Sequence, residues 1–373
     1  MKRNLIIVVN DDAFFLSHRL RIAERAKEEG WEVTILTKDT GKGGLIKSNG
    51  FGFKALPINP TGLNLYQELK LLKFFIRFFK QHQSSVVHFV GIKNILWGGM
   101  ATKFSHTKGN LFAVSGLGTL FGENKSGFVS SLVIKLLKKG MKGTNNAVIF
   151  QNHEDEDLFM KEGISESLKT YFIKGSGVRL EKYKKKTRPE SSKVRIIFTG
   201  RLIKEKGVLD LIEAAEILRK KYIHRIEILI CGDVCAHPES VTREEMQLKC
   251  DGRYIKWLGY REDIPELLAE SDIMCYPSYY REGVPKALLE ASASSLPIVT
   301  TDSVGCRDTV EEGKNGFLVP PHSPEKLAEA LEKLIKDKDL REKMGKYSRL
   351  KAEREYNVEK VADKHLEIYQ SLI

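Results

Sequence analysis

Short runs of consecutive apolar residues alternate with amphipathic stretches along the chain. In the first half, the apolar runs span residues 5–9, 31–37, 85–90, 111–115 and 146–152. Each run has the length and continuous apolar character of a strand buried on both faces. Between the first two runs we expect a helix that Ser17 caps, that continues to about Glu29 and that Gly30 ends. This order of strand, helix and strand predicts a parallel sheet.

The same pattern starts again after a polar, charged stretch at residues 179–193. The second series of apolar runs spans residues 194–200, 226–232, 254–259, 272–277 and 296–301. Amphipathic spacing predicts helices over residues 208–221, 324–336, 338–349 and 358–371. Two such series predict an α/β fold of two Rossmann-like domains facing across a cleft. The expected domains are 1–180 and 190–355, with a last helix, 356–373, that packs back on the N-terminal domain.

Composition fits two soluble domains, because 42% of the 373 residues are hydrophobic and 29% are charged. No apolar run approaches the roughly 18 residues of a membrane-spanning helix. The first run meets Asp11 and Asp12 rather than a small-residue cleavage site, so we interpret it as a strand and not as a signal peptide. All five cysteines lie in the second half without a C-x-x-C pair, which favours reduced thiols in a cytoplasmic protein.

Positive charge is concentrated in the first half of the chain. Residues 1–180 hold 26 Lys and Arg against 15 Asp and Glu, so they carry nearly all of the formal net charge of +12. Within residues 65–81, four cations recur at helical spacing beside an apolar face, and these are Lys70, Lys73, Arg77 and Lys80. Although burial of that face is the default, this stretch and residues 133–142 favour contact with an anionic membrane surface. Nucleic acid is not expected, because no recognition-helix pattern is present.

Two acidic residues flank a proline in the segment 281–302. Pro285 is tolerated in the first turn of a helix, and the N–H groups and dipole of that turn would form an anion site beside Glu282. Glu290 would lie on the same helix face and accept hydrogen bonds from vicinal hydroxyls such as those of a ribose. An amphipathic helix with two solvated glutamates is the alternative that the spacing leaves open.

A pair of basic residues follows the strand that ends at Gly200. Arg201 and Lys206 lie on the loop into the next helix, at the carboxyl edge of the sheet where open α/β folds bind ligands. Arg and Lys at this edge can neutralise a diphosphate. Taken alone, two basic residues on a surface loop would be the simpler interpretation.

Together these segments resemble the retaining glycosyltransferases of the GT-B fold, in family 4. The resemblance is densest in FTGRLIKEKGV (198–208), ICGD (230–233), WLGYREDIPELLAESDIMCYPS (257–278), REGVPKALLEA (281–291) and GCRDTVEEGKNGFLVPP (305–321). It implies that Glu282 faces the transferred sugar, that Glu290 faces the nucleotide ribose, and that Arg201 and Lys206 hold the diphosphate. The other donor-binding residues that it implies are Gly200, Gly232, Gly283, Val284, Pro285 and Leu288.

The N-terminal half resembles a branch that acts on undecaprenyl-diphosphate-linked saccharides in O-antigen, capsule or protein glycan assembly. The segments that carry this resemblance are FFLSHRL (14–20), VHFVGIKN (87–94), VSGLGTLF (114–121) and FQNHED (150–155). It implies a UDP-sugar donor, a hexose or N-acetylhexosamine as the transferred group, a lipid-linked saccharide acceptor, and a place on the inner face of the plasma membrane. The acceptor-side candidates are His18, His88, Ser115, Gly116 and His153, although such histidines are more often structural.

Three positions depart from the family pattern. NDDAFF (10–15) replaces a Gly-rich loop, Ser115 stands where many members have a histidine, and Ser295 stands where Gly is usual. A catalytic histidine is therefore not expected before Gly116. The resemblance also implies that the leaving phosphate takes the acceptor proton, so we expect neither a divalent metal nor a cofactor. A UDP-sugar 2-epimerase of the same fold and a non-catalytic scaffold in membrane glycan assembly remain alternatives.

Overall fold

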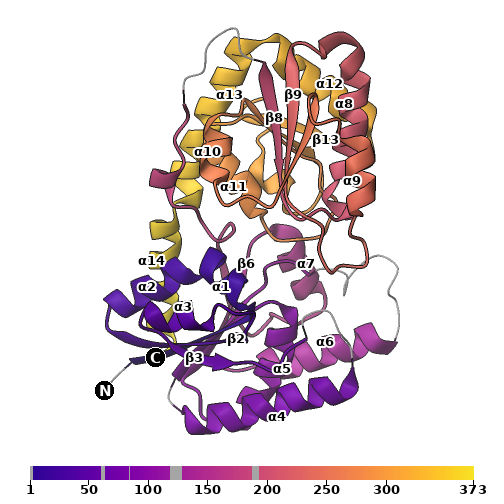
Figure 1. Ribbon diagram of the computed structural model, residues 1–373. Helices are drawn as coiled ribbons and strands as arrows, with labels where there is room; N and C mark the ends of the chain where they lie inside the picture. The colour runs from indigo at the N-terminus through magenta and orange to yellow at the C-terminus, as the bar shows by residue number, and fades with distance from the viewer. Residues whose placement is uncertain (1–2, 60–63, 84, 118–127, 187–192) are drawn as a thin grey trace. The chain divides into compact units, whose positions relative to one another are not determined.

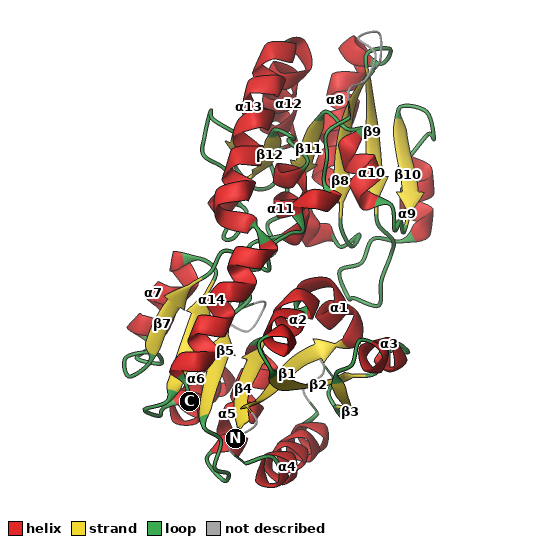
Figure 2. Cartoon of the chain, turned by 90° about the vertical axis from the view of Figure 1, so that its left-hand side faces the viewer, coloured by secondary structure: helices red, strands yellow, loops and turns green. Residues whose placement is uncertain are grey.

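The computed structural model describes residues 3–59, 64–83, 85–117, 128–186 and 193–373. The chain forms two compact units, one of residues 1–176 with 358–373 and one of residues 177–357. Each unit is a parallel sheet with helices on both faces (Figures 1 and 2). The prediction of an α/β fold with two Rossmann-like domains is confirmed. Parts of two predicted segments, 118–121 and 187–192, lie outside the described residues.

The N-terminal unit contains a seven-stranded sheet in the order β3-β2-β1-β4-β5-β6-β7. Its strands are β1 (Arg3–Asp11), β2 (Trp31–Lys38), β3 (Gly52–Ala55), β4 (Ser85–Val90), β5 (Gly109–Ala113), β6 (Asn146–Phe150) and β7 (Lys169–Phe172). In the parallel register, Ile7 of β1 lies opposite Ile35 of β2 and His88 of β4. The edge strands β3 and β7 are four residues each and largely exposed or half-buried, so they lack the continuous apolar run by which the other strands are recognised.

Helices cover both faces of this sheet (Figure 1). They are α1 (Asp12–His18), α2 (Leu20–Glu28), α3 (Gly43–Ser48), α4 (Leu65–Gln81), α5 (Ile92–Thr102), α6 (Phe128–Met141), α7 (His153–Lys161) and α14 (Val358–Ser371). One core contains Leu5 and Ile7 with side chains of α1, α2, α3 and α14. The other contains Ile6 and Val8 with side chains of α4, α5 and α6. This alternation follows from the two-residue period of strand β1.

The predicted start of the first helix is wrong. Asp11, not Ser17, is the N-cap, and its carboxylate accepts a hydrogen bond from the Phe14 backbone N–H at 2.7 Å. The Ser17 hydroxyl instead donates to the Ala13 carbonyl within α1, at 2.7 Å. The helical segment is divided at Arg19, which is the C-cap of α1 and the N-cap of α2.

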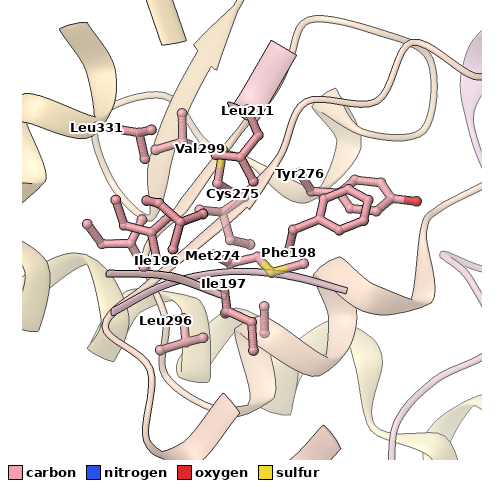
Figure 3. Packing of buried hydrophobic residues seen from close by; sticks show 14 of the residues in the cluster. Ile196, Ile197, Phe198, Leu211, Met274, Cys275, Tyr276, Leu296, Val299 and Leu331 are labelled. Carbon is pink, nitrogen blue, oxygen red and sulfur yellow. The ribbon is translucent and has the colours of Figure 1, made fainter. Parts of the chain in front are cut away.

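The C-terminal unit contains a six-stranded sheet in the order β10-β9-β8-β11-β12-β13. Its strands are β8 (Val194–Thr199), β9 (Ile226–Cys231), β10 (Ile255–Gly259), β11 (Ile273–Tyr276), β12 (Ile298–Thr301) and β13 (Gly316–Val319). Its α-helices are α8 (Val208–Tyr222), α9 (Arg243–Lys249), α10 (Ile264–Ala269), α11 (Lys286–Ala293), α12 (Pro324–Lys336) and α13 (Lys338–Lys351). Central strands pack their aliphatic side chains into one core, where Ile196, Met274 and Val299 lie close together (Figure 3).

The last helix belongs to the N-terminal unit. α14 packs beside α2, where Arg21 pairs with Glu359 at 2.7 Å and Arg25 pairs with Asp363 at 2.7 Å. The polypeptide therefore passes between the units twice, near residue 176 and near residue 357. In the part of the chain that the structure describes, no helix combines the length and the apolar character needed to cross a membrane.

Candidate active site

The strand order of the C-terminal unit reverses between β8 and β11. Chain segments that leave the carboxyl ends of these strands diverge to opposite sides of the sheet, and such a reversal is where open α/β sheets bind ligands. The loop after β8 carries Arg201 and Lys206, and the loop after β11 carries Glu282. Three of the candidate residues therefore lie at one topological switch point.

Backbone contacts hold these two loops together. The Glu205 carbonyl accepts hydrogen bonds from the backbone N–H groups of Tyr279 at 2.9 Å and Tyr280 at 3.0 Å. Gly207 has φ +73°, and a Cβ at that position would lie 2.0 Å from the Pro277 carbonyl oxygen. Only glycine fits both the left-handed conformation and this approach. The short 3₁₀ turn Lys204–Lys206 is thus fixed against the loop that carries Glu282.

Lys206 and Glu282 form a largely buried ion pair. Lys206 is only 5% exposed, and its Nζ donates to Glu282 Oε1 and to the Tyr276 hydroxyl, the latter at 2.6 Å. The same Nζ lies 5.3 Å from the ring centroid of Tyr276 and 5.2 Å from that of Tyr280, within range of cation–π attraction. The site therefore stabilises a buried cation with one carboxylate, one hydroxyl and two aromatic faces.

The Tyr276 hydroxyl links both members of the pair. It donates to Glu282 Oε1 at 3.2 Å while it accepts from Lys206. Burial raises the pKa of Tyr276 well above its ordinary value, and the Glu282 carboxylate raises it further. The hydroxyl consequently keeps its proton and stays a donor toward Glu282.

Arg201 differs from Lys206 in its surroundings. Its side chain is exposed, and it forms no ion pair with any residue that the structure describes. Arg201 is nevertheless close enough to Tyr276 for its positive charge to lower the pKa of the Tyr276 hydroxyl, although burial raises that pKa by more. Arg201 therefore adds a second positive charge at the solvent side of the ion pair.

Glu282 and Glu290 do not share a helix face, contrary to the prediction. Helix α11 begins at Lys286 with Pro285 as its N-cap, so Glu282 lies in the preceding loop. Glu290 is in the helix, and its Oε1 accepts a hydrogen bond from the Tyr183 hydroxyl at 2.8 Å. No side chain caps the N-terminus of α11, and its first turn has no acidic residue. These features favour an anion at this helix end.

The predicted glycines mainly permit close backbone approaches. A Cβ at Gly232 would lie 1.8 Å from the Gly200 carbonyl oxygen, so the backbone after β9 can approach the backbone after β8 this closely only with glycine at this position. Gly283 packs against Gly305, where an added Cβ would lie 2.0 Å from the Gly283 carbonyl oxygen. The side chains of Val284 and Leu288 are buried in the core of this unit.

Of the histidines predicted on the acceptor side, His88 is in the wrong place for a ligand. It is fully buried in β4, and its Nδ1 bonds the Tyr369 hydroxyl of α14 at 2.7 Å. His18 is half-buried and stacks on Phe14 at 4.4 Å between ring centroids. His153 is exposed at the start of α7 and stacks on Phe172 at 4.4 Å. Both histidines belong to the N-terminal unit, whereas Lys206 belongs to the C-terminal unit.

Ser115 and Gly116 follow β5 of the N-terminal unit. Both are half-buried, and Gly116 has φ +105°. The positive φ is a backbone conformation that glycine adopts without strain. Residues 118–127, which follow Leu117, lie outside the described residues.

Two carboxylates occupy the place of the Gly-rich loop after β1. Asp11 caps α1, while the Asp12 Oδ2 accepts from the backbone N–H groups of Thr40 at 2.7 Å and Lys42 at 2.9 Å. Burial alone would raise the pKa of Asp12, but the hydrogen bonds from Thr40 and Lys42 lower it below its usual value. The segment 41–44 is therefore anchored by Asp12, with α3 starting at Gly43.

Three tyrosines of the site were not predicted from the sequence. Tyr276 ends β11, Tyr280 lies in the following loop, and Tyr183 follows the 3₁₀ turn Leu180–Lys182. The position of Tyr276 at the carboxyl end of a strand was the available signal. Among the described residues, no group of three or more His, Cys, Asp or Glu is placed to hold a metal ion.

Two family models match the chain in succession. Residues 5–152 match the family described as glycosyl transferase 4-like, and residues 180–351 match glycosyl transferases group 1. An N,N'-diacetylbacillosaminyl-diphospho-undecaprenol alpha-1,3-N-acetylgalactosaminyltransferase of Campylobacter jejuni is 24% identical over 381 residues, which cover 96% of this chain and 98% of that relative. A UDP-Gal:alpha-D-GlcNAc-diphosphoundecaprenol alpha-1,3-galactosyltransferase of Escherichia coli is 26% identical over 363 residues, which cover 94% and 92%.

Solved structures share the same architecture. Anabaena HepE in complex with UDP superposes with a TM-score of 0.77 at 18% identity, over 100% of both chains. Sucrose-phosphate synthase from Thermosynechococcus elongatus superposes with a TM-score of 0.80 at 18% identity, over 100% of this chain and 99% of that one. At this level of identity the superpositions show a common fold.

Proposed function

We propose that this chain, a glycosyltransferase of the GT-B fold that belongs to the group 1 glycosyl transferases, moves a hexose or N-acetylhexosamine from a UDP-sugar to a polyprenyl-diphosphate-linked saccharide. The observation that carries the proposal is the cluster of Arg201, Lys206 and Glu282 at the switch point of the C-terminal sheet. The Campylobacter and Escherichia relatives, named for undecaprenol-linked acceptors, support the acceptor class. The UDP complex of the Anabaena structure supports the nucleotide.

The cations fit the charge that develops on the leaving group. As the bond between the anomeric carbon and the diphosphate oxygen breaks, UDP takes the electron pair and the sugar acquires oxocarbenium character. Arg201 and Lys206 would stabilise the departing UDP, and the uncapped end of α11 would add its dipole. The acceptor oxygen then bonds the anomeric carbon on the same face, so configuration is retained, and its proton passes to the leaving phosphate.

Glu282 and Glu290 would orient the donor. Glu282 would accept hydrogen bonds from hydroxyls of the transferred sugar once the diphosphate draws Lys206 toward itself. Glu290 would accept from the ribose hydroxyls through Oε2, because its Oε1 already bonds the Tyr183 hydroxyl at 2.8 Å. On the N-terminal unit, the carboxylates of Asp11 and Asp12 would repel a diphosphate, which supports the C-terminal unit as the main donor-binding unit.

Membrane contact through the N-terminal unit is a second part of the proposal. The outer side of α4 exposes Lys70, Lys73, Arg77 and Lys80, and its first turn exposes Leu65 at 71%, Tyr66 at 76% and Leu69 at 52%. Basic residues beside exposed apolar ones are the composition of a helix that lies in an anionic membrane surface. We place this surface on the inner face of the plasma membrane, where a lipid-linked acceptor would be available.

The test incubates purified protein with a panel of UDP-sugars and a polyprenyl-diphosphate saccharide, and the products are identified by mass spectrometry. A glycosylated lipid with an alpha linkage is expected. Lys206→Ala should lower turnover by roughly 10²–10³-fold, whereas Lys204→Ala, which removes an exposed cation of the same turn, should leave it within a factor of two. Conversion of a UDP-sugar without acceptor would identify an epimerase instead, and undiminished turnover of Lys206→Ala would refute the assignment.

A further inference from the structure

We propose that Tyr276 is a positioning residue for the reaction. Its hydroxyl contacts both Lys206 and Glu282, and it keeps Glu282 directed at the sugar when the donor draws Lys206 away from that carboxylate. The inference rests on the proposed function, and it concerns a residue that neither the motif pattern nor the charge pattern identifies. Its basis is the geometry around one hydroxyl oxygen.

The Tyr276 ring is held rigidly. Tyr276 is 3% exposed, and its ring stacks on that of Phe198 with 5.5 Å between centroids and 17° between planes. Its carbonyl oxygen accepts a hydrogen bond from the Thr300 hydroxyl at 2.5 Å. Figure 3 shows the two rings side by side, with the Tyr276 hydroxyl oxygen pointing away from the aliphatic side chains of the core. The packing of the ring and the hydrogen bond of the backbone therefore fix the position of the hydroxyl independently of the ion pair that it contacts.

This hydroxyl uses both of its hydrogen-bonding functions on charged groups. It accepts from Lys206 Nζ at 2.6 Å and donates to Glu282 Oε1 at 3.2 Å. A phenolic hydroxyl has one donor and can accept at the same time, so one oxygen serves both partners. Hydrogen bonds to charged groups are stronger than those between neutral groups.

Donor binding has to rearrange this ion pair. Without donor, Glu282 neutralises Lys206, so a diphosphate must compete with a carboxylate for the same ammonium. An ammonium has three donors, of which Tyr276 takes one and Glu282 another. When the diphosphate draws Lys206 away from Glu282, the partly buried carboxylate would lose its cation, which is unfavourable. The Tyr276 hydroxyl can still donate to Glu282 Oε1 and keep that carboxylate directed at the sugar.

The neighbouring Tyr280 offers a matched control. Its ring faces Lys206 Nζ at 5.2 Å, nearly the same distance as the ring of Tyr276 at 5.3 Å. The Tyr280 hydroxyl bonds no residue that the structure describes, whereas the Tyr276 hydroxyl bonds both members of the ion pair. Replacement of either tyrosine by phenylalanine keeps the ring and removes only the hydroxyl.

The experiment measures kcat and KM for the donor in the wild-type enzyme, Tyr276→Phe and Tyr280→Phe. We expect Tyr276→Phe to lower kcat and kcat/KM together, by about 10- to 100-fold, with KM changed less than about threefold, because the lost hydrogen bonds act mainly in the transition state. Tyr280→Phe should lower kcat clearly less than Tyr276→Phe does, because the Tyr280 hydroxyl bonds neither member of the ion pair. The folded state of both variants is checked by thermal unfolding.

Two results would overturn the inference. One is a kcat of Tyr276→Phe no lower than that of Tyr280→Phe. The other is a rise in KM that accounts for the whole loss, since this would mean that the hydroxyl contributes equally to ground-state binding. Failure of the proposed function is distinguished by the wild-type enzyme itself, which would then transfer no sugar from any UDP-sugar of the panel.

Discussion

His88 on β4 and Tyr369 on α14 are joined by a hydrogen bond of 2.7 Å, although 281 residues separate them in the sequence. His365, one turn before Tyr369, lies 5.4 Å from His88 between ring centroids. Both histidines are almost completely buried, and Arg19 lies near them. The contact between the last helix and the N-terminal sheet thus includes a polar cluster inside an apolar core.

This cluster predicts that the N-terminal unit loses stability in mild acid. Burial lowers the pKa of His88 well below its ordinary value, and burial together with the charge of Arg19 lowers the pKa of His365 to about 3. Unfolded histidines take up a proton below about pH 6.5, whereas the folded ones stay neutral, so stability is present above pH 6.5 and falls below it. For His365 alone, the free energy of unfolding at about pH 5 is about 2 kcal/mol lower than it is well above pH 6.5.

Thermal unfolding followed between about pH 7.5 and pH 5 measures this effect. The variant His365→Asn should show a shallower decline of Tm with falling pH than the wild type. His153→Asn, which removes an exposed histidine, is the control and should follow the wild-type curve. A Tm that does not change over this pH range would contradict the assignment of neutral buried histidines.

The end of helix α11 predicts a stabilising substitution. Ser295 has φ +59°, the left-handed conformation that glycine adopts without strain, and the Leu296 N–H bonds the Ala291 carbonyl at 3.1 Å across the turn. Ser295→Gly should therefore stabilise the C-terminal unit by roughly 0.5–1 kcal/mol, seen as a higher urea midpoint. Ser294→Gly, at a neighbouring position with φ −81°, should lower the midpoint.

Arg201 predicts a loss of activity without a loss of stability. Its side chain is exposed and has no ion-pair partner among the described residues, so Arg201→Ala should leave Tm within about one degree of the wild type. Turnover with the UDP-sugar should fall roughly 10²-fold, because a cation that stabilises the leaving diphosphate is lost. Arg201→Lys should recover only part of the lost turnover, since a lysine ammonium cannot bind two phosphate oxygens at once as the arginine guanidinium can. Full activity of Arg201→Ala would exclude this role.

The exposed cations of α4 predict charge-dependent membrane binding. Each Lys or Arg near an anionic surface contributes about 1 kcal/mol, so changing Lys70, Lys73, Arg77 and Lys80 to glutamine should weaken binding to phosphatidylglycerol-containing vesicles by more than about 100-fold. Co-sedimentation measures the bound fraction. A control removes four exposed lysines of the C-terminal unit, Lys220, Lys249, Lys343 and Lys346, and should bind like the wild type. Equal loss in both variants would indicate only an effect of net charge.

The sequence predicts those parts of the fold and site that depend on local pattern. Arg201 and Lys206 could be placed on one loop because an apolar run ends at Gly200, and the helices from Pro324 to Ser371 begin and end close to their predicted bounds. The contact between Lys206 and Glu282 could not be predicted, because it depends on the Glu205 carbonyl holding two backbone N–H groups of another loop.

The errors have physical causes of the same kind. The sequence leaves His88 as an acceptor-side candidate, although a structural role is the more common one, because no local signal shows that its partner is a hydroxyl 281 residues away. The spacing predicts Glu290 on the same helix face as Glu282 because the sequence does not show that Pro285 is the N-cap of α11 rather than a residue of its first turn. The strand-end position of Tyr276 is the one signal the sequence offers, and it is weak, because a tyrosine at the end of a strand is also typical of a core position.

The double passage of the polypeptide between the units sets an order on biosynthesis. On the ribosome, residues 177–357 are complete before residues 358–373 have been translated, yet α14 supplies the contacts of Tyr369 with Trp31 and His88 in the N-terminal unit. The N-terminal unit can therefore complete its fold only after the whole C-terminal unit has been translated. Until the final helix arrives, the nascent N-terminal sheet keeps part of one apolar face open to chaperones and to other chains.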